Sequence, residues 1–343
     1  MEIVGAVHGH STYSDGRGTV EQIRDAAADA GLDFLILTDH DTLSPLAEVG
    51  EGFHRGTLML FGCEVSPPTN HLLVFGAGTC PDRTKAPQAY IDDARGQGAL
   101  TFLAHPHDRG VPLARIPSYR WDAWPIEGYT GLEIWNHLSD WSGHLRGLSS
   151  ALGALRRPLL ALYGPDDETL GLWDDVGQSR RVVGIAGLDV HDVQIGRPPF
   201  VAHIFRYAYA MRTLLCYVDV PQWSDDPQAA KADLLGAIAQ GHLHFANREL
   251  ADARGLAFLG LRPGAPPLTM GDEGPAGDVR EFRLTSPQPA DLRVLKDGRT
   301  IGSTSGRELL VPASGQGVYR AELRLRRGGK SLPWAFTNPI YLR

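Results

Sequence analysis

Short apolar runs that end in histidine or an acidic residue recur through the first 190 residues, and this pattern restricts the possible folds most. Each run has the length, and the β-branched or aromatic content, of a buried strand. Six of the runs carry their polar residues after the run, whereas His71 precedes its run and indicates a strand that runs the other way. We predict seven strands, over Ile3–Val7, Phe34–Leu37, Leu58–Cys63, Leu72–Phe75, Ala99–Leu103, Gly131–Trp135 and Val182–Leu188.

Helix-like segments lie between several of these strands. The clearest covers Thr19–Ala30 and is followed by Gly31, which suits the left-handed position after a helix, and another covers Pro87–Gly96. Alternating strands and helices predict parallel strands with right-handed crossovers. Seven strands favour an α/β barrel, in which active-site groups lie at the carboxyl ends of the strands. We predict this domain over residues 1–250, with an insertion or lid at about 140–180 and a closing helix over Asp226–Gln240.

The composition changes near Gly255, where several prolines and glycines mark irregular chain. Alternating strands follow, and Asp297-Gly298 is a strong hairpin-turn pattern. We predict a small C-terminal antiparallel β-sandwich over residues 256–343, an accessory domain with no catalytic constellation of its own. Its expected strands are Val279–Leu284, Leu292–Leu295, Glu308–Val311, Val318–Leu325 and Trp334–Tyr341.

The overall composition narrows the function classes. A net charge of −7 without a basic stripe argues against a nucleic-acid polymer as partner and favours a small-molecule substrate, which can still be anionic. The three cysteines, Cys63, Cys80 and Cys216, do not make a disulfide framework, and a sparse, odd count is typical of a reducing compartment. We expect no signal peptide, and no apolar stretch reaches the roughly 18 residues that a membrane span needs. We therefore expect a cytoplasmic protein with no membrane partner, whose oligomeric state the sequence does not indicate.

Histidines and carboxylates with metal-ligand spacing follow the first two strands. His8 and His10 are two apart, so on a strand both imidazoles point to one face and can reach one ion. Ser14-Asp15-Gly16 is ordinary turn chemistry by itself, but after His-x-His its carboxylate can turn back over the strand ends. His40 ends the second strand in Thr38-Asp39-His40-Asp41, where Asp39 or Asp41 can orient an imidazole and Asp41 or Thr42 can cap a helix.

The later strand ends supply further candidates. Glu64 ends a buried run, where an unpaired carboxylate would be costly and a metal ion would remove that cost. Cys63 should point to the opposite side and belong to the core. Nitrogen and carboxylate ligands suit zinc, manganese or iron, so we predict a cluster of two or three divalent ions. The other candidate ligands are His71, His105 in His105-Pro106-His107, and Asp189 and His191 after the seventh run.

This ordered set resembles the PHP (polymerase and histidinol phosphatase) superfamily over roughly residues 1–250. The resemblance rests on His8-x-His10, Ser14-Asp15-Gly16, Thr38-Asp39-His40-Asp41, Ala104-His105-Pro106 and Asp189-x-His191. It implies a distorted (β/α)7 barrel and three metal ions. The segment Trp334–Tyr341 also resembles the tail of a branch that includes carbaryl hydrolase-like metallohydrolases.

The resemblance further implies how the ligands are shared. His8, His10, Glu64 and Asp189 would hold the first ion. Glu64 would bridge to a second ion, shared with His71 and His105, and His137 is the rival of His71 for that place. Asp15, His40 and His191 would hold the third.

A cluster of this kind suits phosphoester hydrolysis, because paired ions lower the pKa of a shared water and neutralise charge on the attacked group. The leading hypothesis is a phosphoesterase on a small phosphorylated metabolite or nucleotide. Carboxyl-ester or carbamate hydrolysis at the same site is the second hypothesis, and a non-catalytic, metal-stabilised binding module is the third. The candidates for proton transfer are Asp189, His191 and His107. The candidates for substrate binding are Arg17, Arg109, His137 and Arg197.

Overall fold

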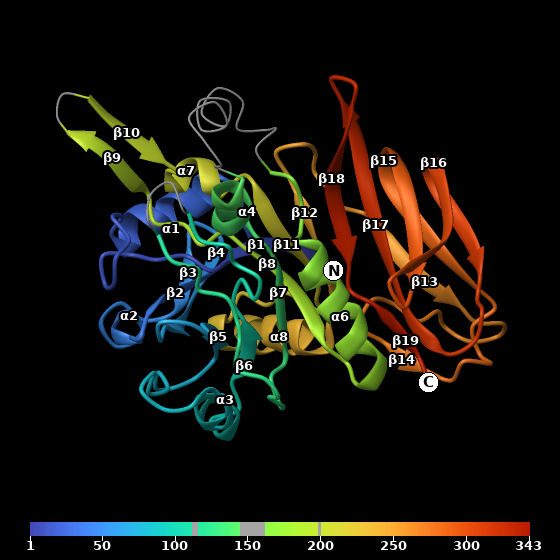
Figure 1. The fold of residues 1–343 in the computed structure, drawn as a ribbon, viewed down its shortest axis with the longest axis horizontal. Helices are drawn as coiled ribbons and strands as arrows, with labels where there is room; N and C mark the ends of the chain where they lie inside the picture. The colour runs from blue at the N-terminus through green and yellow to red at the C-terminus, as the bar shows by residue number, and fades with distance from the viewer. Residues whose placement is uncertain (112–115, 145–161, 198–199) are drawn as a thin grey trace.

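The protein has a mixed α/β fold in which strands from almost the whole chain join one large sheet. The computed structural model describes residues 1–111, 116–144, 162–197 and 200–343, with side chains outside 195–202. Seventeen strands form the sheet, and β9 (Val193–Arg197) and β10 (Phe200–Ile204) form a separate hairpin. In Figure 1 the strands of the first half, in blue and green, lie to one side of the late orange and red strands.

Seven strands of the first 190 residues follow one another along a closed path of hydrogen bonds. Four neighbouring pairs, β1–β2, β2–β4, β6–β7 and β7–β8, are parallel, whereas β5 is antiparallel to both β4 and β6. The path closes where Gly9 bridges Val190 and where the Asp189 N–H donates to the His8 carbonyl at 2.7 Å. The bounds are Glu2–Val7 (β1), Phe34–His40 (β2), Thr57–Val65 (β4), Leu72–Phe75 (β5), Leu100–Leu103 (β6), Gly131–Asn136 (β7) and Val183–Gly187 (β8).

All seven predicted runs coincide with these strands, and the general expectation of parallel strands does not extend to β5. Residues 66–71 are all that connect β4 to β5, and this is shorter than the ten to twelve residues or more that a parallel crossover needs. The reversal that the position of His71 indicated is therefore confirmed.

Helices alternate with the strands along the chain. The three helices that the sequence predicted are present: α1 (Val20–Asp29), α3 (Pro87–Gly96) and α8 (Pro227–Gln240). Thr19 caps α1 through a capping box with Gln22, and Gly31 follows the helix at φ +68°. The described part of the predicted insertion contains α6 (Asp167–Ser179), and residues 145–161 lie outside the described residues. Shorter elements are α2 (Ser44–Glu48), β3 (Gly52–His54), α4 (His137–Gly143) and α7 (Tyr207–Ala210).

The C-terminal strands continue the same sheet, because β12 pairs with both β11 and β18. The predicted hairpin at Asp297-Gly298 is confirmed: it joins β15 to β16, and both residues have the positive φ that a type I′ turn requires. The remaining bounds are Leu214–Asp219 (β11), Leu243–Asn247 (β12), Ala257–Leu261 (β13), Glu273–Gly274 (β14), Glu281–Lys296 (β15), Arg299–Pro312 (β16), Gly317–Arg327 (β17), Lys330–Thr337 (β18) and Ile340–Leu342 (β19).

Two buried side chains near the C-terminus, one between β18 and β19 and one in β19, bind backbone groups at the start of β8. The Asn338 amide donates to the Gly184 carbonyl and accepts from the Gly184 N–H, both at 2.8 Å. The Tyr341 hydroxyl donates to the Val182 carbonyl at 3.0 Å. Because every buried peptide group needs a partner, these two side chains are part of what holds β8 in place.

The three cysteines do not form a disulfide framework, but Cys63 and Cys80 form a single disulfide. The turn from β4 into the reversed β5 brings the two positions together, with their Cα atoms 6.1 Å apart. The Cys63 side chain is buried in the core, as predicted, and Cys216 is buried and free. The cysteine count therefore no longer indicates a reducing compartment. Across the described parts of the chain, no helix combines the length and apolar character needed to cross a membrane.

Candidate metal centre

The strands bring all nine predicted metal ligands to one mouth. His8 and His10 follow β1, and Glu64 lies near the end of β4. Because β5 is antiparallel to β4 and β6, its amino end lies at the same rim as their carboxyl ends, and this places His71 beside the others. The remaining ligands are His40 at the end of β2, His105 after β6, Asp189 and His191 after β8, and Asp15 in the turn after His10.

Two imidazoles and two carboxylates form the first group. His8 Nε2 lies 3.3 Å from Glu64 Oε2 and 3.5 Å from Asp189 Oδ1. His10 Nε2 lies 3.4 Å from the same glutamate oxygen and 3.3 Å from the same aspartate oxygen. Both histidines and Glu64 are almost completely buried.

Glu64 faces a second group with its other oxygen. Its Oε1 lies 2.9 Å from His71 Nδ1 and 3.2 Å from His105 Nε2. One carboxylate thus presents one oxygen to each group, as a bridging ligand does. His137, the rival of His71, lies elsewhere: its Nδ1 is 3.0 Å from Thr213 Oγ1, and burial lowers its pKa to about 3.

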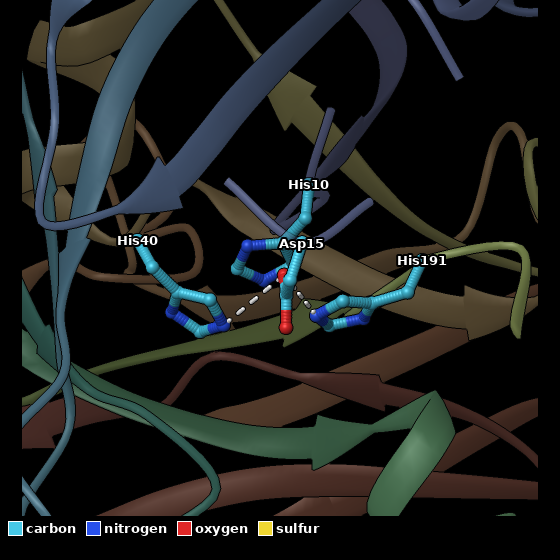
Figure 2. Close-up of side chains that lie close together, drawn as sticks. All are labelled: His10, Asp15, His40 and His191. Carbon is cyan, nitrogen blue, oxygen red and sulfur yellow. Dashed lines mark ion pairs between the residues drawn. The ribbon is translucent and has the colours of Figure 1, made fainter. Parts of the chain in front are cut away.

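The third group gathers around Asp15, and Figure 2 shows its four side chains converging. Asp15 Oδ1 lies 3.1 Å from His191 Nε2 and 3.5 Å from His40 Nε2. His10 belongs to this group as well, with its ring 4.2 Å from that of His40 and 4.1 Å from that of His191. The Asp15 carboxylate is 60% exposed and marks the open side of the cluster.

The residues fit divalent ions, because the atoms that face one another lack hydrogen-bond partners. His8 Nε2, His10 Nε2 and Glu64 Oε2 are buried, and none makes a hydrogen bond within the described part of the chain. Leaving such groups unpaired costs a protein about 1–3 kcal/mol each. Their separations of 3.3–3.4 Å match the ~3.3–3.6 Å between ligand atoms that surround one tetrahedral ion at about 2.0–2.2 Å.

The electrostatics of the cluster lead to the same conclusion. Burial would raise the pKa of Glu64 and of Asp189, but the neighbouring imidazoles hold both pKa values well below their usual range. Burial would lower the pKa of His40 and of His105, but Glu64 raises both to about 9. The cluster thus holds positive charge around two buried carboxylates, and divalent ions supply such charge when they displace the protons.

The backbone is strained at three of the ligands. His8, His105 and Asp189 have φ angles of +64°, +30° and +53°, in a region that residues other than glycine rarely adopt. Each costs on the order of 1–3 kcal/mol, and such strain concentrates at functional sites. The surrounding hydrogen bonds therefore hold these side chains where the chain alone would not.

Residues behind the ligands include two that the sequence reasoning missed, Glu133 and Asn136 of β7, which contact His8 and Asp189. Two further acids differ from expectation, because within the described residues neither Asp39 nor Asp41 forms a hydrogen bond or ion pair with an imidazole. Asp39 accepts from the backbone N–H and hydroxyl of Ser11, which fixes the loop after His10. Asp41 accepts from the Ser66 N–H, and the Ser66 hydroxyl lies 2.6 Å from His40 Nδ1, so the orienting contact runs through a serine.

The candidates for proton transfer and substrate binding outside the ligand set are more dispersed. A cavity of about 500 Å³ extends from His105 past His107 to the start of α6. His107 lies in its wall, with Nδ1 2.8 Å from Thr169 Oγ1, and Arg109 pairs there with Asp166 at 2.5 Å. The backbone N–H of Arg17 donates to the His191 carbonyl, which places this exposed residue beside the third group. The side chain of Arg197 lies outside the described residues.

Comparisons with known proteins give one partial sequence match and several structural similarities. No protein-family model matches the chain. Over 61 residues, 18% of this chain, it is 43% identical to the phosphoribosyl 1,2-cyclic phosphate 1,2-diphosphodiesterase of Eggerthella lenta, and the match spans 23% of that enzyme. The chain is also similar to two solved structures whose descriptions name metal-dependent phosphoesterases.

The first solved structure is a two-domain protein from Bacteroides vulgatus that contains a predicted PHP-like metal-dependent phosphoesterase. Its TM-score is 0.44 at 13% identity, over 98% of this chain and 95% of the other. The second is a candidate metal-dependent phosphoesterase from Bifidobacterium adolescentis. Its TM-score is 0.32 at 14% identity, over 54% of this chain and 87% of the other.

Proposed function

We propose that this protein is a metal-dependent hydrolase of the PHP type, and specifically a phosphoesterase that acts on a small phosphate ester with two or three bound Zn, Mn or Fe ions. One observation carries the proposal: buried, unpartnered ligand atoms of His8, His10 and Glu64 face one another at the spacing of ligands around one ion. The 61-residue similarity to a cyclic phosphodiesterase supports the reaction class. We also propose that the closed path of strands is the distorted (β/α)7 barrel and that residues 256–343 are its accessory β-sandwich.

The three groups of side chains are the proposed binding places for the ions. His8, His10, Glu64 and Asp189 would hold one ion, Glu64 would bridge to another at His71 and His105, and Asp15, His40 and His191 would hold a third. When bound, the ions would supply an acidified water and neutralise charge on the phosphoryl oxygens.

The protein's own side chains would then orient the ester and move protons. Asp15 lies at the open side, and its pKa is lowered to about 2, because the nearby histidines outweigh the effect of burial. This carboxylate stays ionised at neutral pH, as a metal ligand must be, and it lies on the side that faces arriving substrate. Asp189 and His191 are the proposed proton-transfer partners deeper in the mouth. The cavity beside His105 would hold the leaving group, with His107 and Arg109 in its wall and Arg17 at the opposite rim.

The test is release of phosphate, or opening of a ring, by protein stripped of metal and then loaded separately with Mn²⁺, Zn²⁺ or Fe²⁺. The substrates are a panel of phosphomonoesters, a phosphoribosyl 1,2-cyclic phosphate and aryl carbamates. We expect turnover of at least one phosphate ester that depends on added metal. His10→Ala should lower it by more than about 100-fold, because removal of a ligand costs more than the 10–100-fold of an outer contact.

His54→Ala is the matched control, because His54 lies at the surface and pairs with Asp25 at 2.6 Å, away from the cluster. It should keep wild-type turnover. Hydrolysis of carbamates with no phosphate ester turned over would replace the proposed reaction by the alternative one. Absence of turnover on the whole panel with every metal would contradict an enzymatic role.

A further inference from the structure

Glu133 is a buried carboxylate that stands directly behind the metal ligands without being one of them. It lies in the middle of β7 and is 1% exposed. Its Oε1 is 2.7 Å from His8 Nδ1, and its Oε2 accepts from the backbone N–H of His105 at 2.8 Å and from the amide of Asn136 at 2.9 Å. Three donors from three segments of the mouth thus meet on one side chain.

The adjacent strand leaves room for this carboxylate only because residue 187 is glycine. A Cβ at Gly187 would lie 1.9 Å from Glu133 Oε1 and 2.9 Å from the Cβ of His8. Any side chain there would displace either the carboxylate or the imidazole. The contact between Glu133 and His8 therefore depends on a specific feature of β8.

The contact decides which nitrogen of His8 faces the cluster. An ionised carboxylate only accepts hydrogen bonds, so the proton of a neutral His8 ring must sit on Nδ1. The lone pair is then on Nε2, the atom that faces Glu64 Oε2 and Asp189 Oδ1 and has no hydrogen-bond partner. A metal ligand needs this arrangement, because an ion binds the unprotonated nitrogen.

A second contact extends the effect to Asp189. The Asn136 amide that donates to Glu133 also lies 3.3 Å from Asp189 Oδ2. This leaves Oδ1 of Asp189 to face His8 and His10. Through one direct and one relayed contact, Glu133 therefore orients ligands that come from β1 and β8.

We propose that Glu133, in the space that Gly187 leaves, is a positioning residue of the metal centre, which fixes the ring nitrogen that His8 presents and the oxygen that Asp189 presents. The inference rests on the proposed function, because it needs ions at the first group. Glutamine has the same shape but only one acceptor oxygen, so it cannot accept from all three donors. Removal of such an outer contact lowers metal affinity by about 10–100-fold.

The experiment measures Co²⁺ binding by calorimetry and by visible absorption, on wild type, Glu133→Gln, Gly187→Ala and a matched control. The control is Glu51→Gln, because Glu51 is also a nearly buried glutamate that accepts from a backbone N–H, here of Phe61, and pairs with a cationic group, here of Lys231. Glu133→Gln and Gly187→Ala should each weaken Co²⁺ binding by about 10–100-fold and change the absorption bands that report coordination. Glu51→Gln should lose stability with affinity and spectrum unchanged.

The outcomes separate this inference from the proposed function. Wild-type affinity and an unaltered Co²⁺ spectrum in folded Glu133→Gln would overturn the positioning role while leaving the metal centre intact. No Co²⁺ binding by wild type would overturn the metal centre itself. If neither variant folds, nitrogen-15 NMR of the Zn²⁺-loaded wild type decides: the His8 ring, assigned by its contacts to Gly187, must carry its proton on Nδ1, and a proton on Nε2 would refute the role.

Discussion

Arg320 gives the sharpest test of how the C-terminal strands support the rest of the molecule. Its guanidinium is 2% exposed, stacks over Trp173, and donates to Asp174 Oδ1 and Oδ2 at 2.7 and 2.8 Å. Asp174 belongs to α6, so this bidentate pair joins β17 to the helix that precedes β8. A third nitrogen donates to Glu322 at 2.6 Å.

Replacing Arg320 by methionine keeps much of the volume and leaves two carboxylates without their cation. Removing one partner of a buried pair costs about 3–5 kcal/mol. Glu322 is 13% exposed and can regain some water, whereas Asp174 at 7% cannot readily do so, so we expect the full loss of about 3–5 kcal/mol, with most of it from Asp174. The double variant Arg320→Met, Asp174→Leu should recover most of this loss, because it removes both charges of the more deeply buried pair and leaves only the partly exposed Glu322 without its cation.

The assay is urea unfolding at neutral pH, followed by tryptophan fluorescence and by circular dichroism. Arg326→Met is the control, because its side chain is 76% exposed in a pair with Asp291 and should change the free energy of unfolding by less than about 1 kcal/mol. A loss of less than about 1 kcal/mol in Arg320→Met, or a double variant no more stable than the single one, would contradict the role assigned to this buried pair.

Two further predictions concern charge inside the molecule. Glu64→Gln should lose metal from two groups, because the two oxygens of Glu64 face different histidines, whereas Asp15→Asn should lose metal from one group. The measurement is the number of bound metal ions, counted by mass spectrometry after dialysis. Equal losses in the two variants would contradict the bridging role of Glu64. His244 of β12 is buried against the Tyr217 ring, and burial lowers its pKa to about 4. The fold therefore favours the neutral ring, and the stability that this ring contributes is complete above about pH 6.5 and is lost as the pH falls toward 4. Between pH 7 and pH 5 the wild type should lose about 2 kcal/mol more than His244→Phe in urea unfolding, and parallel pH profiles would rule the effect out.

The sequence predicted the strands and their ligands well, because both follow from short-range patterns. An apolar run followed by His-x-His or Asp-x-His describes a buried strand and its exit in fewer than ten residues. Even the reversed direction of β5 is indicated by a local pattern, since His71 precedes its apolar run instead of following it. For these elements, the residues close to one another in the sequence are enough to predict the structure.

The remaining features depend on contacts between distant residues. Glu133 lies inside the run Gly131–Trp135, and its partner His8 is 125 positions away, so nothing near it in the chain distinguishes it from an ordinary strand residue. The pairing of Cys63 with Cys80 requires the reversal of β5, and cysteine counting does not include that geometry. The predicted insertion at about 140–180 contains the regular helix α6, in which Gly177 lies so close to Val318 of β17 that an added Cβ would be 3.2 Å from it.

The clamp that Asn338 and Tyr341 place on β8 has a consequence for how the protein is made. Gly184 and Val182 receive these partners only after the ribosome has passed residue 341, some 150 residues beyond His191. Until then the strand that leads to Asp189 and His191 lacks part of its backbone pairing, although all nine candidate ligands have already been synthesised. At the proposed metal centre, capture of metal would therefore follow synthesis of the late strands, and a chain arrested near residue 250 should bind Co²⁺ more weakly than the whole chain.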